Sequence, residues 1–195
     1  MRINSIIFVF LILSLHAIKG EEWNVDGSAQ NEVKFVSQAE TFLKNFEFDG
    51  VTDKIDGYLY WENDSMFFKN EFYFEVQVGS FKTGINKRDQ DMRTMVLETD
   101  KWPISSYKGT MVKYEKIDTT VTAYRYVSEG MFNLHGVEKK ISVPGILIIS
   151  DNKIEVQASF SVLLTEYKME IPSILVAKVA NEIHLGLIFY MNNAN

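Results

Sequence analysis

Residues 71–78 read EFYFEVQV, and this short stretch decides the fold because its hydrophobic and polar residues alternate. Phe72, Phe74 and Val76 fall on one face of an extended strand, and the two glutamates fall on the other. Such a strand belongs to an antiparallel sheet that packs one face on a core and exposes the other to water.

The same period of two recurs along the chain. It is found in residues 31–38, 119–127 and 152–160, and these are followed by a long apolar stretch at residues 181–192. Turn signals such as Asp151-Asn152 separate the strands at intervals of about ten residues, which is typical of an antiparallel sandwich or an up-and-down barrel. The last stretch is apolar on both faces and would be prone to aggregation at a sheet edge. A closed barrel, which has no edge, is therefore favoured.

Two segments between the strands have a helical pattern. Residues 39–46 are expected to form one short helix, and residues 172–181 a second. The second is apolar around most of its circumference, so another part of the molecule should cover it. We expect residues 174–180, with Leu175 and Val179, to cover a barrel mouth.

A third helix is expected to start at Asn86. Asn86 is a favourable N-cap residue, and Asp89 lies three positions later, as in a capping box. Asp89 and Arg93 are four residues apart and could form an ion pair on the helix surface. The apolar face of this helix is expected to consist of Met92, Met95 and Val96. Local physics thus explains the charges of residues 83–92 without a catalytic role.

The first twenty residues have the layout of a secretory signal peptide. Arg2 gives a positive start, residues 6–15 are almost entirely apolar, and small or polar residues follow. The apolar run is shorter than the ~20 residues that span a bilayer comfortably, although an uncleaved anchor is the alternative. We therefore expect a signal peptide at residues 1–20, one domain at residues 21–195, and no stable membrane insertion after processing.

Composition limits the partners of the mature chain. Loss of Arg2 and Lys19 with the leader leaves 18 basic and 26 acidic residues, a net charge of −8. A chain this acidic, without a basic cluster, is a poor partner for nucleic acid or an anionic membrane. With no cysteine, the core must hold the fold without disulfides, and the 14 Phe, 9 Tyr and 3 Trp of the full chain suit that role.

Residues 80–103, SFKTGINKRDQDMRTMVLETDKWP, resemble the central motif of the YceI-like family, also called polyisoprenoid-binding proteins. The matching positions, expected to be structural, are Thr83, Arg88, Asp89, Trp102 and Pro103. The resemblance continues in residues 129–144, EGMFNLHGVEKKISVP, and extends over about residues 23–191. It implies an eight-stranded, lipocalin-like antiparallel barrel, a periplasmic or secreted location, and a long-chain isoprenoid or other lipid in the lumen.

The pattern of alternation predicts which side chains face that lumen. They are Phe72, Phe74, Val76, Phe132, Leu134, Phe160, Leu185 and Leu187. In a barrel of this size such side chains either fill the interior or leave room for one ligand. From the residues alone both remain open, and a filled barrel would favour an interaction module or adhesin. A homodimer is also left open.

Residues that could carry chemistry are few and scattered. His135 and His184 lie in distant segments, so we expect no metal site, and no cofactor motif occurs. An enzyme would need ionisable groups in the lumen; the candidates, if they face inward, are Glu71, Glu75, Arg125 and His135. Residues 83–92 contain no nucleophile with an adjacent base, and no nucleophile elbow or zincin motif occurs in the chain, so it is not expected to be an enzyme.

Overall fold

The structure is a computed structural model, and it describes residues 20–41, 43–62, 69–117, 120–150, 152–171, 173–174 and 177–194. Its strands are β1 Gly20–Val25, β2 Glu32–Thr41, β3 Asn45–Thr52, β4 Ile55–Glu62, β5 Asn70–Gln77, β6 Ile104–Lys116, β7 Thr122–Leu134, β8 Val137–Ser150, β9 Lys153–Leu163, β10 Ser173–Ile174, β11 Ala177–Val179 and β12 Glu182–Asn193. Its helical segments are η1 Val78–Ser80, α1 Asn86–Asp91, η2 Met92–Val96 and η3 Leu164–Tyr167.

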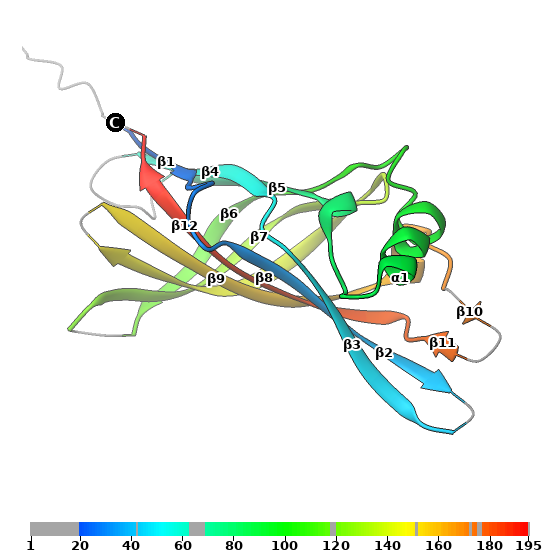
Figure 1. Cartoon of the computed structure of the whole chain (residues 1–195). Coiled ribbons are helices and arrows are strands. Elements are labelled where there is room, and N and C mark those ends of the chain that lie inside the picture. Colours follow the sequence, from blue (N-terminus) through cyan, green and yellow to red (C-terminus); the bar gives the residue numbers. More distant parts are fainter. Residues whose placement is uncertain are drawn as a thin grey trace, which may run out of the picture.

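Within these described residues, eight strand positions close into one antiparallel barrel (Figure 1). The order around the ring is β1-β4-β5-β6-β7-β8-β9-β12, and β12 pairs with β1 to close it. β2 continues the position of β1 and pairs with β12 further along, and β3 pairs with β2 and leads into β4. The predicted barrel is confirmed, and the apolar last strand has neighbours on both sides.

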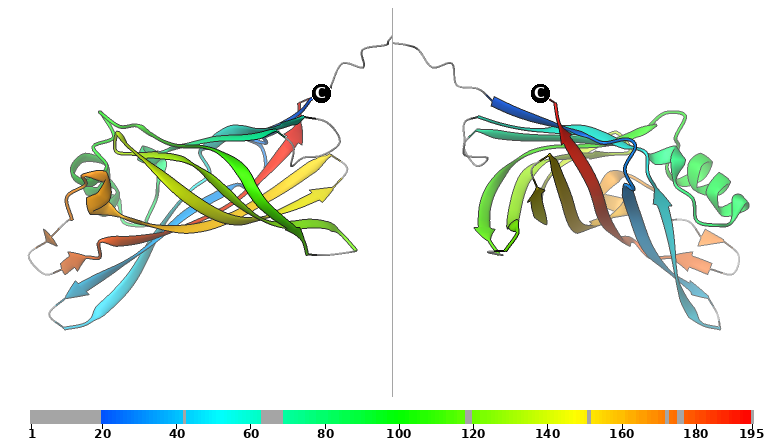
Figure 2. Two further views of the ribbon diagram at one scale, coloured as in Figure 1. Left: turned by 180° about the vertical axis from the view of Figure 1, so that it is seen from behind. Right: turned by 60° about the vertical axis from the view of Figure 1, so that its left-hand side comes forward.

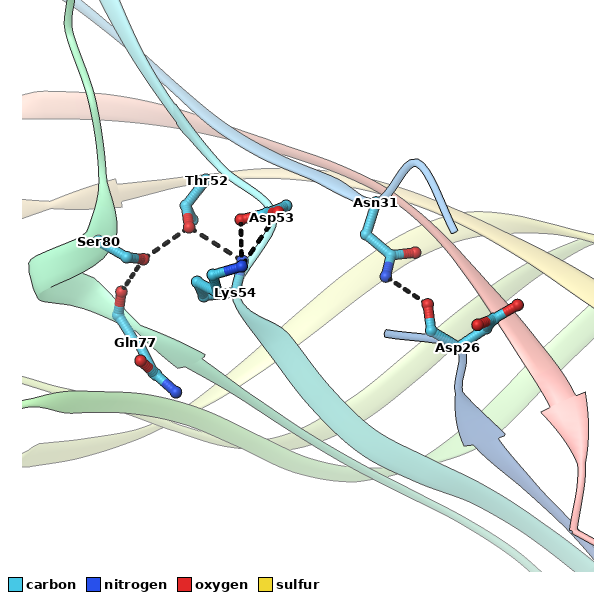
Figure 3. A network of polar contacts seen from close by, with 7 residues as sticks. All are labelled: Asp26, Asn31, Thr52, Asp53, Lys54, Gln77 and Ser80. Atoms are coloured by element: carbon cyan, nitrogen blue, oxygen red, sulfur yellow. Dashed lines mark hydrogen bonds and ion pairs between the residues drawn. The ribbon is translucent and has the colours of Figure 1, made fainter. Parts of the chain in front are cut away.

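Polar side chains stabilise the two breaks where β1 gives way to β2 and β3 to β4 (Figure 3). At the first, the Asn31 side chain donates to the carbonyl of Asp26 at 2.8 Å and accepts from the backbone N–H of Tyr190 at 3.0 Å. At the second, the Thr52 hydroxyl accepts from the Lys54 N–H and lies 2.6 Å from the Ser80 hydroxyl. These bonds replace ladder bonds that the bends interrupt, so buried backbone groups keep partners.

Two of the three expected helices are wrong. Within residues 39–46, positions 39–41 end β2 and 45–46 begin β3, with Phe42 outside the described residues. Thr41 forms the turn instead: its hydroxyl donates to the Lys44 carbonyl and accepts from the Lys44 N–H. Within residues 172–181, positions 173–174 form β10 and 177–179 form β11, which pairs with β2, and Leu175 lies outside the described residues. Pairing with a projecting strand outweighed local helix preference.

The chain between β5 and β6 contains α1 and η2 and lies at one end of the barrel. Figure 2 shows this helical segment, β10–β11 and the β2–β3 turn grouped at that end. The C terminus and the β6–β7 and β8–β9 turns lie at the other end. The two ends of the barrel are therefore built differently.

Candidate functional site

The lumen is filled at one end and hollow at the other, as the inward residues of β12 show. Phe189 and Met191, towards its C-terminal end, are completely buried in a packed cluster. Ile183, Leu185 and Leu187, on the same face of the strand, line a cavity instead. The filled end is the cluster that contains Trp23, Leu59, Trp61, Phe72, Tyr126, Leu147, Ile154, Val156, Phe189 and Met191.

The cavity at the hollow end has a volume of about 420 Å³. Small-molecule sites are commonly concave, mostly apolar and about 300–1,000 Å³ in size, so this one is large enough for a ligand. Its apolar wall includes Val33, Phe35, Phe48, Val76, Phe81, Phe132, Leu134, Phe160, Val162, Met169, Val179, Ile183, Leu185 and Leu187. Such a wall attracts hydrocarbon by the hydrophobic effect.

Polar side chains contribute little to this wall. Among the described residues that line it, they are Ser37, Lys87, Arg88, Asp91 and Ser105. The Ser105 hydroxyl is buried and donates to the carbonyl of Asn133 at 2.7 Å, so it already has a partner. Lys87 is exposed and binds Asp91 at 2.6 Å. Charge therefore lies at the helical side of the opening, and the interior is apolar.

Thr83, Arg88 and Asp89 of the sequence motif form one hydrogen-bonded cluster beside the cavity. The Asp89 carboxylate is buried, with an exposed fraction of 3%, and accepts from both the N–H and the hydroxyl of Thr83. Arg88 donates to the hydroxyl and the carbonyl of Thr83, and its guanidinium lies 4.8 Å from the ring centre of Phe48. The cluster thus fixes the start of α1 against a residue of the cavity wall.

Asp89 acts differently from the expected capping box. Its carboxylate binds Thr83, six residues earlier, and α1 has Ile85 at its N-cap without a side-chain bond. Burial opposes ionisation of Asp89, but the bonds from Thr83, with weaker attraction to Lys82 and Arg93, outweigh it and lower its pKa. The expected Asp89–Arg93 ion pair is not formed; within the described residues the pair four apart is Lys87–Asp91.

The helical segment turns Met92 and Val96 into the cavity and Met95 out of it. After α1 the chain continues as one wide π-helical turn, with a bond from the Leu97 N–H to the Met92 carbonyl. A turn of this width aligns a residue with the fourth and fifth that follow it, so Met92, Val96 and Leu97 share the inner face. Met95, expected on the apolar face, is instead 71% exposed.

Trp102 and Pro103 hold the other end of the helical segment to the barrel. Trp102 lies over Gly136, where a Cβ atom would collide with its ring, and its ring centre is 6.0 Å from that of His135. His135 contacts Glu98 at 3.0 Å and the carbonyl of Tyr167 at 3.3 Å. The carbonyl of Pro103 accepts from the N–H of Val78. These contacts are structural.

Six of the eight side chains predicted to bind ligand line the cavity. They are Val76, Phe132, Leu134, Phe160, Leu185 and Leu187. Phe72 and Phe74 face inward as expected but belong to the filled end, where Phe74 packs edge-on against Phe189 at 4.7 Å. That these six residues contact a ligand stays a prediction.

The cavity wall contains residues that the sequence reasoning missed. Val33 and Phe35 of β2 had a visible signal, because they alternate with polar residues. Phe48 was missed because it follows residues 39–46, which were expected to form a helix; Val179, expected to cover the barrel mouth from a helix, lines the cavity from strand β11. Correct strand assignments there would have placed them by parity.

The ionisable residues considered for chemistry lie away from the cavity. Glu71 accepts from the Tyr58 hydroxyl and binds Lys108, and Glu75 accepts from the Tyr73 hydroxyl. Arg125 is exposed beside Glu115. The fourth candidate, His135, lies in the β7–β8 turn, and the other histidine considered, His184, is exposed on β12 beside Ser161.

Metal-binding groups and membrane-spanning helices can be assessed for the residues described above. No three potential metal-binding side chains come together in that part of the chain. Nor does it contain a helix of the length and apolar character needed to cross a membrane.

Comparison with known families identifies the chain. Residues 23–189 match the YceI-like domain, which is most of the 195 residues. The chain belongs to the YceI-like family. The resemblance seen in the sequence is thereby confirmed. In the structure, the residues of the family motif form the Thr83 cluster and the contacts of Trp102 and Pro103. No curated protein matches the chain.

Solved structures share this YceI-like fold at low sequence identity. BcnA from Burkholderia cenocepacia is 13% identical, with a TM-score of 0.66 over 85% of this chain and 98% of that one. A polyisoprenoid-binding domain from Saccharophagus degradans, described as implicated in plant cell wall breakdown, is 14% identical. Its TM-score is 0.64 over 90% of this chain and 99% of that domain. At these identities the likeness shows the fold.

Proposed function

We propose that this YceI-like protein holds a long apolar chain, an isoprenoid or a similar lipid, in the hollow end of its barrel. The observation that carries the proposal is the cavity, whose wall is apolar within and polar at its opening. Each buried methylene of a ligand contributes about 0.8 kcal/mol, so an elongated hydrocarbon can bind without a specific polar contact. The polyisoprenoid-binding relative supports the isoprenoid class.

The proposed role is that of a carrier and not of an enzyme. Glu71, Glu75 and Arg125 are engaged on the outer surface, and the described cavity wall contains no histidine. The alternative of an adhesin with a filled barrel has less support, because the hollow end leaves about 420 Å³ open. The leader-like residues 1–20 support a periplasmic or secreted location.

A pair of tryptophan substitutions on β12 tests the site. Leu185 lines the cavity, whereas Ile188, three residues later, faces outward and is 40% exposed. Leu185→Trp should fill the cavity and weaken binding by at least about tenfold, because the ring displaces several ligand methylenes. Ile188→Trp should leave binding unchanged.

The readout is displacement of a fluorescent apolar probe by geraniol, farnesol and geranylgeraniol. Affinity should rise steeply with chain length, up to about fourfold per buried methylene, until the cavity is full. Equal loss in both variants, or no displacement of the probe by any of the three alcohols, would overturn the proposal.

A further inference from the structure

Four large apolar side chains are exposed at the hollow end of the barrel. Leu43 in the β2–β3 turn is 88% exposed and Met95 in η2 is 71% exposed. Ile85, just before α1, and Phe46 at the start of β3 are also exposed. We call these four residues the rim, and Figures 1 and 2 show that the elements that carry them project from the same end.

The rim is continuous with the cavity wall. Phe46 and Ile85 both line the cavity and reach solvent, so apolar surface runs from the interior to the outside. The far end of the barrel also exposes apolar residues, for example Val112 and Ile117. That end, however, is filled by the packed cluster. The rim is therefore distinguished by its position around an entrance.

Charged residues of both signs lie near the rim. Lys87 is paired with Asp91, Lys178 of β11 stands opposite Glu40 of β2, and the β2–β3 hairpin carries one exposed lysine and one exposed glutamate, Lys44 and Glu47. This mixture of signs does not select a strongly charged partner. It suits a surface with an apolar interior and a neutral headgroup layer, where lysines keep their ammonium groups at headgroup level.

We propose that the rim docks onto the surface of a lipid bilayer, with Leu43 and Met95 inserted among the lipid chains. The inference rests on the proposed function, because a carrier of apolar ligand must take its cargo from a source and deliver it. Docking would join the bilayer interior to the cavity through Phe46 and Ile85, so the ligand would avoid exposure to water during transfer. The contact is peripheral, and the barrel does not cross the membrane.

Sedimentation with phosphatidylcholine vesicles tests the docking. The protein is produced with its leader, and the processed chain is purified and checked by mass. The double variant Leu43→Asp, Met95→Asp should bind vesicles at least about tenfold more weakly than wild type, because charge resists transfer into hydrocarbon. Val112→Asp, which places a charge on an exposed apolar position at the far end, should bind like wild type. Binding should persist at high salt, because it does not depend on charge attraction.

Equal binding by wild type and the double variant would overturn docking through the rim. An equal loss in the Val112→Asp variant would also do so, as would loss of binding at high salt.

Displacement of the probe by farnesol in vesicle-free solution separates this proposal from the proposed function. Leu43 and Met95 lie outside the cavity wall, so the double variant should bind farnesol as wild type does. Normal farnesol binding with unchanged vesicle binding would refute docking and leave the carrier function intact. If wild type binds vesicles but no farnesol, the proposed function fails instead.

Discussion

Thr83 is the residue that joins the other members of the family motif's hydrogen-bonded cluster. Its hydroxyl accepts from Arg88 and donates to Asp89, so one small side chain joins a cation and a buried carboxylate. The Asp89 carboxylate also accepts from the Thr83 N–H at 2.9 Å. Buried charge is tolerated only when it is hydrogen-bonded in this way. The cluster therefore determines where α1 begins beside the cavity.

Asp89→Asn should destabilise the fold in a pH-dependent way. Because the native pKa of Asp89 is lowered, its stabilising contribution is present above the ordinary aspartate pKa and is lost as the pH falls through the native value. At neutral pH the variant should lose about 1–3 kcal/mol of unfolding free energy, and the difference should shrink in acid. Urea unfolding of the variant and the wild type, at neutral pH and in acid, measures this difference in unfolding free energy.

Asp91→Asn is the matched control for that experiment. Asp91 forms a surface pair with Lys87, whose side chain is largely exposed, so its loss should cost about 0.5 kcal/mol or less. An Asp89→Asn variant whose stability parallels wild type at every pH would contradict the role assigned to the Thr83 cluster.

Among the elements, β6 and β7 meet at a sharply coiled point between the two ends of the barrel. Gly109 and Gly130 face each other there in register. The Tyr107 side chain lies over Gly109, where a Cβ would collide with its hydroxyl, and that hydroxyl contacts Ser128 at 2.8 Å. Burial raises the pKa of Tyr107. Glycine at both positions lets the strands coil closely around this ring.

Gly130→Ala should strain this crossing. Its Cβ would meet the carbonyl oxygen of Lys108 and the Cα of Gly109, both backbone atoms that cannot rotate away. We expect a loss of about 1–3 kcal/mol of unfolding free energy, measured by urea unfolding. At Gly186 of β12 a Cβ would meet nothing within 4 Å, so Gly186→Ala should be neutral or stabilise by up to about 1 kcal/mol. Equal effects of the two substitutions would refute the close approach.

Sequence periodicity predicted strands well and helices poorly for a physical reason. A strand such as β2 buries every second residue from Val33 to Ala39, so its pattern follows directly from the packing. Residues 39–41 and 177–179 are far apart in the sequence but pair with each other as strands, and no local pattern reveals such pairing. The π-helical turn that exposes Met95 contains a main-chain hydrogen bond from the Leu97 N–H to the Met92 carbonyl. This bond changes which side chains share a face of the helix, and no pattern in the sequence indicated it.

For the whole molecule, the alternation of residues along each strand predicted which side chains face inward. It did not predict where along the barrel the lumen is open. Phe72 and Phe160 are both inward aromatics, yet one belongs to the filled end and the other to the cavity wall. The difference depends on height along the barrel axis, which follows from strand stagger and three-dimensional packing. The barrel was therefore predictable, whereas the division of its interior was not.

The two ends of the barrel interior contribute differently to the protein. The filled end, which includes the stacked Trp23 and Trp61, supplies a dry core for a fold without cysteine. The hollow end can therefore keep apolar surface uncovered, and in the proposed function a ligand covers that surface. The helical segment and the β2–β3 hairpin lie at this end of the barrel (Figure 2).

Native mass spectrometry with lipid extraction, on protein purified from its own compartment, tests the central claim most directly. We predict a long-chain apolar species that accompanies the folded protein and is released on denaturation. The Leu185→Trp variant, purified in the same way, should carry much less of it. A clean apo mass that stays unchanged with added isoprenoid would contradict the carrier function.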